Sequence, residues 1–193
     1  MNVSESNQTV EKAIIVSDGC CVRLGDSSVL DDVTFSIEKG KKVAVVGPNG
    51  GGKSTLFNAI TGLLPIDNGS LTIYGKKPEE VRGSISYVPQ KDLLNKNFEL
   101  TVKQVVEMGL IGKKTLSIFS QRKTNLKIQK SLESVGLLEK IDENINNLSG
   151  GQFQRVLIAR GLAQNADILI LDEAFSAVAV SYTHLTLPTI LPV

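Results

Sequence analysis

Two short apolar runs dominate the hydrophobic pattern of the chain. Residues 43–46 (VAVV) and 168–171 (ILIL) are continuously apolar, which is typical of strands buried on both faces of a parallel sheet. After the first run and a glycine-rich segment, apolar positions recur at helical spacing at Leu56, Ala59, Ile60 and Leu63. The order of strand, loop and helix predicts an α/β fold with a mostly parallel core sheet.

Alternating polar and apolar positions predict a second kind of sheet. The alternation over residues 29–37 favours a half-buried antiparallel strand. Residues 38–41 have a composition typical of a turn, which leads into the run at 43–46. Residues 67–69 (DNG) predict a turn, which is followed by alternation at Leu71 and Ile73. We therefore expect an N-terminal antiparallel β subdomain beside the parallel sheet.

The pattern changes after Pro89. Apolar residues are then spaced as in amphipathic helices, at Val102, Val105, Val106, Ile128, Leu132 and Val135. This spacing predicts an inserted helical subdomain at about residues 94–147. Its basic residues are consistent with an ordinary solvated face or with a face turned toward a membrane surface.

The segment between the first apolar run and its helix carries candidate chemistry. Residues 47–55 (GPNGGGKST) fit G-x-x-x-x-G-K-[ST], a loop whose backbone N–H groups cradle nucleotide phosphates. In such a loop Lys53 neutralises phosphate charge and the Ser54 hydroxyl reaches Mg²⁺. The ATP-binding residues that we predict are Gly47, Pro48, Asn49, Gly50, Gly51, Gly52, Lys53, Ser54 and Thr55.

The second apolar run ends in two carboxylates, Asp172 and Glu173. Beside a phosphate loop, an acid at the end of a strand is placed to orient Mg²⁺, and the next acid to polarise the water that attacks the γ-phosphate. The alternative is a strand that ends at solvent with two hydrated acids. The phosphate loop favours the catalytic interpretation, with Lys53 and Glu173 as catalytic residues and ATP and Mg²⁺ as cofactors.

Composition limits the alternatives. The chain has 193 residues, 41% of them hydrophobic and 21% charged, enough for one sizeable core with a smaller subdomain. A net charge of +1 gives no electrostatic reason to expect a nucleic-acid partner. Cys20 and Cys21 are adjacent and are the only cysteines, so we expect packing residues rather than a disulfide or zinc site. Neither a secretory signal nor a membrane-spanning run is evident, which favours the cytoplasm.

Four segments in a fixed order carry a family resemblance. They are residues 47–55, Ile85 to Gln90 (ISYVPQ), Leu148 to Gln152 (LSGGQ) and residues 168–173. This order resembles the ATP-binding subunit of ABC transporters, a class of P-loop NTPase, and the likeness covers about residues 13–178. We expect residues 1–12 to be a disordered leader.

The resemblance implies further site residues. It implies that Gln90 contacts Mg²⁺ together with Ser54 and Asp172, and that a signature segment at a helix N-terminus binds ATP held by an opposite subunit. The signature segment consists of Leu148, Ser149, Gly150, Gly151 and Gln152. It also implies a head-to-tail dimer that closes on two ATP molecules and reopens after hydrolysis.

A narrower likeness concerns the transported substrate. The stretch from Tyr87 to Gly109 looks like the ATPases of zinc, manganese and iron importers. This likeness implies a transmembrane permease partner, an indirect extracytoplasmic metal-binding partner, and a peripheral location on the inner face of the cell membrane. Two alternatives stay open: a soluble ABC-type ATPase acting on ribosomes or DNA, and a nucleotide-binding fragment without turnover.

The chain departs from the family pattern in three places. Arg23-Leu24-Gly25 stands where an aromatic residue usually stacks on adenine, and Ala179 stands where an aspartate usually bridges the dimer. The family's γ-phosphate histidine has no counterpart, because His184 lies too soon after Glu173. We interpret residues 179–193 as an unrelated tail, typical of translated sequencing adapter, on a domain that lacks its C-terminal elements; the alternative is a divergent terminus that forms an edge strand.

Overall fold

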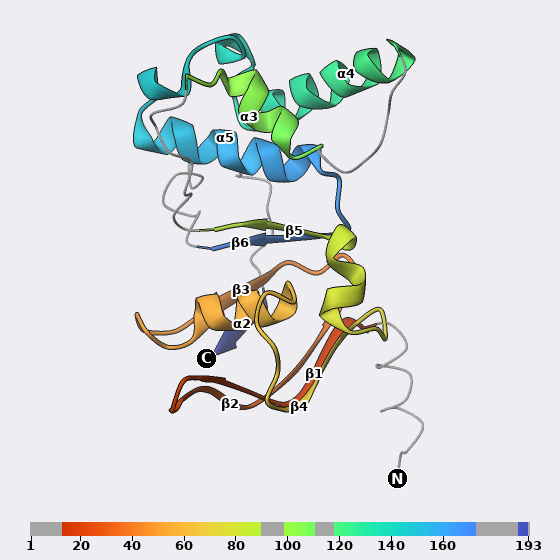
Figure 1. Cartoon of the computed structure of the whole chain (residues 1–193), viewed down its shortest axis with the longest axis vertical. Coiled ribbons are helices and arrows are strands. Elements are labelled where there is room, and N and C mark those ends of the chain that lie inside the picture. Colours follow the sequence, from red (N-terminus) through yellow and green to blue (C-terminus); the bar gives the residue numbers. More distant parts are fainter. Residues whose placement is uncertain (1–12, 90–98, 111–117, 173–188, 193) are drawn as a thin grey trace. The chain divides into compact units, whose positions relative to one another are not determined.

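The computed structural model describes residues 13–89, 99–110, 118–172 and 189–192 (Figure 1). The described residues form an α/β structure, as the apolar pattern predicts. The chain divides into two compact units, of which the first comprises residues 1–82 and 184–193 and the second residues 83–183.

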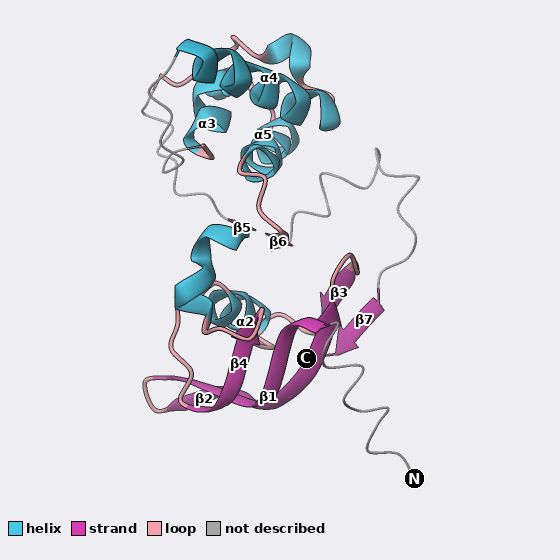
Figure 2. Ribbon diagram, turned by 90° about the vertical axis from the view of Figure 1, so that its right-hand side faces the viewer, coloured by secondary structure: helices cyan, strands magenta, loops and turns pink. Residues whose placement is uncertain are grey.

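A three-stranded antiparallel sheet forms the base of the first unit. The central strand β1 (Ala13–Leu24) pairs with β2 (Ser27–Glu38) on one side and with β4 (Asn68–Ile73) on the other. The helix α2 (Lys53–Ile60) lies beside this sheet (Figure 2). The buried apolar side chains of the unit include Ile15, Cys20, Val22, Leu30, Leu56, Ala59, Ile60, Leu71 and Ile73. The predicted antiparallel strand over residues 29–37 is confirmed by β2.

The strand before the phosphate loop, β3 (Val43–Val46), pairs in parallel with β7 (Thr189–Pro192). The predicted parallel strand is thus confirmed, but the prediction that it is buried is wrong, because its side chains are half-buried and Val46 is 45% exposed. In the described part of the chain, β7 is the one strand that pairs with β3. A strand with a partner on one side only keeps more of its surface exposed than a central strand. The strand β7 lies within the predicted unrelated tail, whose origin stays a prediction.

Helices make up most of the second unit. Among the described residues they are α3 (Val102–Met108), α4 (Ile118–Ser134) and α5 (Gly150–Ala163), with two short 3-10 helices, η2 (Leu138–Lys140) and η3 (Ile145–Asn147). Their buried apolar residues include Val102, Val105, Val106, Ile128, Leu132, Val135, Ile145, Val156, Leu157 and Ile158. The described part of the predicted helical insertion is therefore helical, while its boundaries stay a prediction. None of the helices described is long and apolar enough to cross a bilayer.

The described part of the second unit also contains two parallel strands. The 3-10 segment η1 (Pro78–Ser84) leads into β5 (Ile85–Val88), which pairs in register with β6 (Ile168–Leu171). The Ser86 hydroxyl donates to the carbonyl of Gly161 at 3.1 Å, and Gln164 Nε2 donates to the carbonyl of Ile85 at 3.0 Å. These two bonds hold α5 against β5.

Two further sequence expectations need correction. Asn68 and Gly69 open β4 instead of forming a turn, because Asn68 already pairs with Cys21 of β1. The run at 168–171 is buried at Ile168 and Ile170 only, whereas Leu169 is 38% exposed. Successive residues of a strand point to opposite faces, so burial alternates along β6, and the exposed Leu169 lies on the face turned toward α5.

Candidate functional site

The predicted phosphate loop follows β3 and ends at the first turn of α2. Within it, the Gly51 N–H donates to the carbonyl of Pro48 at 3.1 Å, and the Leu56 N–H donates to the carbonyl of Gly52 at 2.8 Å. Gly52 has a left-handed φ of 84° and is the N-cap of α2. A Cβ there would lie 2.9 Å from Leu30 Cδ2, so both the backbone angle and the contact with β2 require glycine. The loop is therefore a tight turn seated on β2.

Lys53 is the first residue of α2, and its side chain folds back along the loop. Its ammonium group donates to the carbonyl of Gly47 at 2.9 Å and to that of Pro48 at 2.7 Å. The positive charge is thus held at the loop, at the end of α2 where the helix dipole is also positive. Ser54 and Thr55 follow in the first turn, whose backbone N–H groups have no acceptor within the helix. Anions bind at such a helix end.

The hairpin of β1 and β2 carries the segment that departs from the family's adenine-stacking pattern. Leu24 ends β1 and is 47% exposed. Beside it, the Arg23 N–H donates to Asp67 Oδ2 at 2.7 Å, and the Arg23 guanidinium donates to the carbonyl of Asp26 at 3.2 Å. At this position the chain therefore offers an aliphatic side chain, and the predicted loss of base stacking stays a prediction.

In the second unit, Asp172 directly follows β6 and is 4% exposed. Its backbone N–H donates to the carbonyl of Val88 at 3.0 Å, which extends the pairing of β5 and β6 by one residue. Its Oδ2 accepts a hydrogen bond of 3.1 Å from the Tyr87 hydroxyl. Burial, followed by the charge of Asp172, raises the pKa of Tyr87 to about 12. The phenol is therefore a hydrogen-bond donor at neutral pH.

The Asp172 carboxylate fits a divalent cation. Among the described residues it accepts a side-chain hydrogen bond on Oδ2 only, so Oδ1 of a buried anion is left without a donor. Buried charges in proteins are paired or bind metals, and Mg²⁺ prefers oxygen ligands. Gln90 and Glu173, the predicted metal contact and general base, lie outside the described residues.

The signature segment lies at the N-terminus of α5. Ser149 is the N-cap: its hydroxyl accepts from the Gln152 N–H at 3.3 Å, and Gln152 Oε1 accepts from the Ser149 N–H at 2.9 Å. Leu148 is only 8% exposed and belongs to the apolar core, which favours an anchoring role for its side chain. A Cβ added at Gly150 or Gly151 would meet no atom within 4 Å. The first-turn backbone of α5 is therefore accessible, and its contact with ATP stays a prediction.

Two contacts in these regions were not anticipated. The bond between Tyr87 and Asp172 joins residues 85 positions apart, so no local pattern signals it. The reciprocal capping at Ser149 does have a local signal, since S-x-x-Q before an apolar run is a capping-box pattern. Thr101 and Gln104 repeat this pattern at the start of α3.

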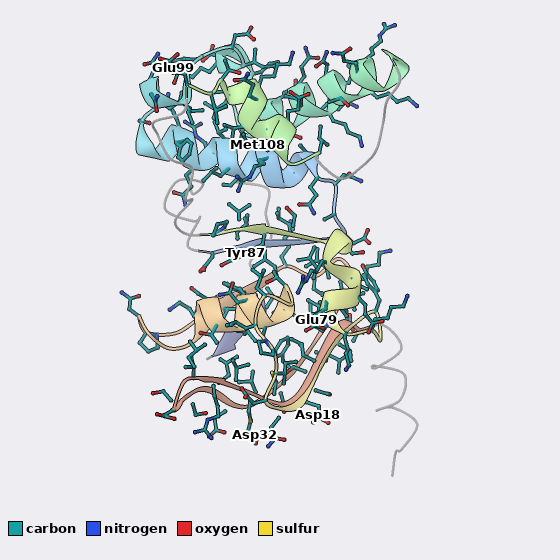
Figure 3. All side chains as sticks on the ribbon, viewed as in Figure 1. Asp18, Asp32, Glu79, Tyr87, Glu99 and Met108 are labelled. Carbon is teal, nitrogen blue, oxygen red and sulfur yellow. The ribbon has the colours of Figure 1, made fainter. Side chains whose placement is uncertain are left out.

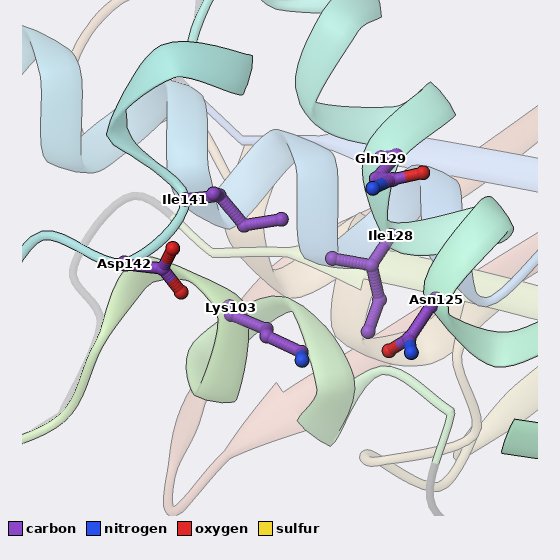
Figure 4. A pocket seen from close by; sticks show the side chains of 6 residues that line it. All are labelled: Lys103, Asn125, Ile128, Gln129, Ile141 and Asp142. Carbon is purple, nitrogen blue, oxygen red and sulfur yellow. The ribbon is translucent and has the colours of Figure 1, made fainter. Parts of the chain in front are cut away.

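A pocket of about 190 Å³ lies among the helices of the second unit (Figure 4). Its lining residues come from α3, α4 and the segment after η2, and they are Lys103, Asn125, Ile128, Gln129, Ile141 and Asp142. None of these lining residues is a predicted site residue.

The motifs fall within a match to a known protein family. A family described as ABC transporter matches residues 30–176, which include the loop, Asp172 and the signature segment. The chain belongs to the ABC transporter family. The predicted resemblance is thereby confirmed.

Relatives in the family match the chain at moderate identity. The manganese transport system ATP-binding protein MntB of Bacillus subtilis is 40% identical over 162 residues, which are 83% of this chain and 64% of that protein. The zinc transport system ATP-binding protein TroB of Treponema pallidum is 40% identical over 150 residues, 78% of this chain and 56% of that protein. The chain thus spans about three fifths of the length of these relatives.

Solved structures support the fold. The chain matches cbiO1 of Clostridium perfringens, part of the ABC transporter complex cbiONQ, with a TM-score of 0.72 and 28% identity. The match covers 87% of this chain and 70% of cbiO1. This similarity confirms the predicted α/β fold class of P-loop NTPases, with an antiparallel β subdomain and inserted helices.

Proposed function

We propose that the chain is the ATP-binding and ATP-hydrolysing part of an ABC transporter that imports a metal ion such as zinc, manganese or iron. The phosphate loop carries this proposal, because Lys53 is held at the loop carbonyls beside the N-terminus of α2. The ATPase activity is supported by the family match, and the metal cargo by the names of the manganese and zinc relatives.

The residues have separate roles in this proposal. The loop amides and Lys53 bind the phosphates, while Ser54, Gln90 and Asp172 hold Mg²⁺, which neutralises phosphate charge when bound. Glu173 takes a proton from the attacking water as the bond between the β-phosphate oxygen and the γ-phosphorus breaks, which gives ADP and phosphate. Positioning and charge stabilisation supply most of the catalysis.

The proposed assembly is a head-to-tail dimer bound to a membrane permease at the inner face of the cell membrane. The signature segment would bind the γ-phosphate of ATP on the opposite subunit through Ser149 and the amides of Gly150 and Gly151. Binding closes the dimer and hydrolysis releases it, which moves the permease. A metal-binding extracytoplasmic protein delivers the cargo to the permease and does not contact this subunit.

The activity is tested by replacing the proposed general base. We expect Glu173→Gln to lower ATP hydrolysis by at least about 100-fold while ATP binding persists and dimers accumulate, because the substitution removes only the proton acceptor. Glu133→Gln, on the exposed face of α4, is the matched control and leaves hydrolysis unchanged. Full hydrolysis by Glu173→Gln would reject Glu173 as the base, and absence of hydrolysis in the unsubstituted chain would favour a binding fragment without turnover.

The cargo is tested in cells whose metal content is measured by elemental analysis. Lys53→Ala should lower cellular zinc, manganese or iron during metal limitation, whereas Lys41→Ala, at an exposed lysine, should not. A metal content that Lys53→Ala leaves unchanged would contradict metal import without bearing on ATPase activity.

A further inference from the structure

We propose that Tyr87 is a positioning residue whose hydroxyl fixes the Asp172 carboxylate so that its other oxygen faces a divalent cation. The inference rests on the proposed role of Asp172 in holding Mg²⁺. It starts from the 3.1 Å hydrogen bond between the Tyr87 hydroxyl and Asp172 Oδ2. Tyr87, labelled in Figure 3, is one residue from the end of β5.

The sheet places both groups on one face. Tyr87 is the register partner of Ile170, and Asp172 lies two residues beyond Ile170, where a strand presents the same face again. The bond between the Asp172 N–H and the carbonyl of Val88 keeps the pairing intact as far as Asp172. Both ends of the side-chain bond are therefore held by paired backbone rather than by a loop.

Contacts with α5 show which face of the sheet Tyr87 and Asp172 occupy. Ser86 and Leu169 alternate with Tyr87 and Ile170 along their strands, so they point the opposite way. Ser86 bonds to Gly161 of α5, and Leu169 Cδ1 lies 3.2 Å from the position of a Cβ on Gly161. Tyr87 and Asp172 thus lie on the face turned away from α5, so their bond does not serve to attach the helix.

The bond has a consequence for a metal ligand. A carboxylate can rotate about its terminal torsion, and a donor on one oxygen restricts that rotation. With Oδ2 engaged by Tyr87, Oδ1 has no donor among the described residues and is left for a cation or its water. Ligating carboxylates are commonly held by such partners, whose loss costs roughly 10- to 100-fold in metal affinity.

The experiment uses the 193-residue chain with Mn²⁺ as a spectroscopic probe for Mg²⁺ and a non-hydrolysable ATP analogue. Electron paramagnetic resonance measures Mn²⁺ affinity, and fluorescent ATP in EDTA measures nucleotide affinity without metal. We expect Tyr87→Phe to weaken Mn²⁺ binding about 10-fold and to change metal-free nucleotide affinity less than about 2-fold. The matched control is Tyr74→Phe, which removes the same atom in the turn after β4 and leaves both affinities unchanged.

Asp172→Asn separates the inference from the proposed function. If Tyr87 acts through Asp172, the double variant binds Mn²⁺ no more weakly than Asp172→Asn alone; additive losses would overturn the inference. Unchanged or tighter Mn²⁺ binding by Tyr87→Phe, while Asp172→Asn weakens it, would overturn the role of Tyr87 only. Unchanged binding by Asp172→Asn, or the absence of nucleotide-dependent Mn²⁺ binding in the unsubstituted chain, would overturn the proposed metal site as well.

Discussion

Cys20 and Cys21 are neighbours in β1 but have different surroundings. Cys20 is fully buried, and burial raises the pKa of its thiol above the ordinary value. Cys21 is half-buried, and its sulfur accepts from the Asp32 N–H at 3.4 Å and donates to the carbonyl of Gly19 at 3.5 Å. The predicted packing role therefore holds for Cys20, while Cys21 lies at a polar, partly accessible position.

The different surroundings of Cys20 and Cys21 predict that their thiols react at different rates. Because the thiolate is the reactive form, a raised pKa lowers the reactive fraction of Cys20 at every pH below that pKa, and burial slows access further. At pH 8 we expect Cys20→Ala, which retains Cys21, to react with a disulfide reagent at least about 10-fold faster than Cys21→Ala. Equal rates in the folded variants would contradict this expectation, and equal rates in urea are the control.

At the residue scale, local motifs predict the conformation of the loop well and long-range contacts poorly. The left-handed backbone angle of Gly52 and its close contact with Leu30 both require glycine. The sequence pattern G-x-x-x-x-G-K-S predicts a glycine at this position. Tyr87 and Asp172 meet because β5 pairs with β6, and the identity of a partner strand is not encoded in either short segment. The apolar pattern of residues 43–46 did not predict that β3 is half-buried, because that pattern does not encode which strands pair with β3.

The helices α3 and α5 begin with the same capping motif. Thr101 with Gln104, and Ser149 with Gln152, form capping boxes in which side chain and backbone exchange hydrogen bonds. Thr101→Ala and Ser149→Ala should therefore each lower the free energy of unfolding by about 1 kcal/mol, measured by urea denaturation.

Of the two capping residues, only Ser149 is expected to affect the proposed dimer. In a Glu173→Gln background, we expect Ser149→Ala to weaken ATP-dependent dimers in size-exclusion chromatography, because the signature segment is proposed to bind the opposite nucleotide. Thr101→Ala, with a matched loss of stability, should leave the dimers intact. Equal weakening by both substitutions would show that stability alone accounts for the effect of Ser149→Ala.

The contact between α3 and α5 depends on a small residue. A Cβ on Gly109, the C-cap of α3, would lie 2.3 Å from the carbonyl oxygen of Arg160 in α5, so one backbone would have to move. We expect Gly109→Ala to lower the free energy of unfolding by about 1–3 kcal/mol, as overpacking does. Gly83→Ala is the control, because its Cβ would meet nothing within 4 Å. A stability equal to that of the control would argue against this close approach.

At the scale of the whole molecule, the two segments proposed to bind ATP belong to different units. The phosphate loop belongs to the first unit, and the signature segment belongs to the second. The family match runs through both, over residues 30–176. If the dimer is head-to-tail, each ATP is completed by the loop of one copy and the signature segment of the other, which makes the two segments separable by mixing variants.

Two variants are suited to this test. Lys53→Ala removes the phosphate-binding charge, and Gly151→Asp places a carboxylate in the first turn of α5, where a Cβ meets no atom within 4 Å. An acid in the first turn favours the helix, so the second substitution should repel phosphate without unfolding α5. Each variant alone should lose ATP hydrolysis, because both sites of its dimer carry the same defect.

Mixing the two variants in equal amounts gives a different expectation. Half of the dimers are then mixed, and each mixed dimer has one site with both defects and one with neither. About a quarter of the unsubstituted rate should return if the two sites work independently. If loop and signature segment instead served the same ATP within one copy, every site would keep one defect and the mixture would stay inactive.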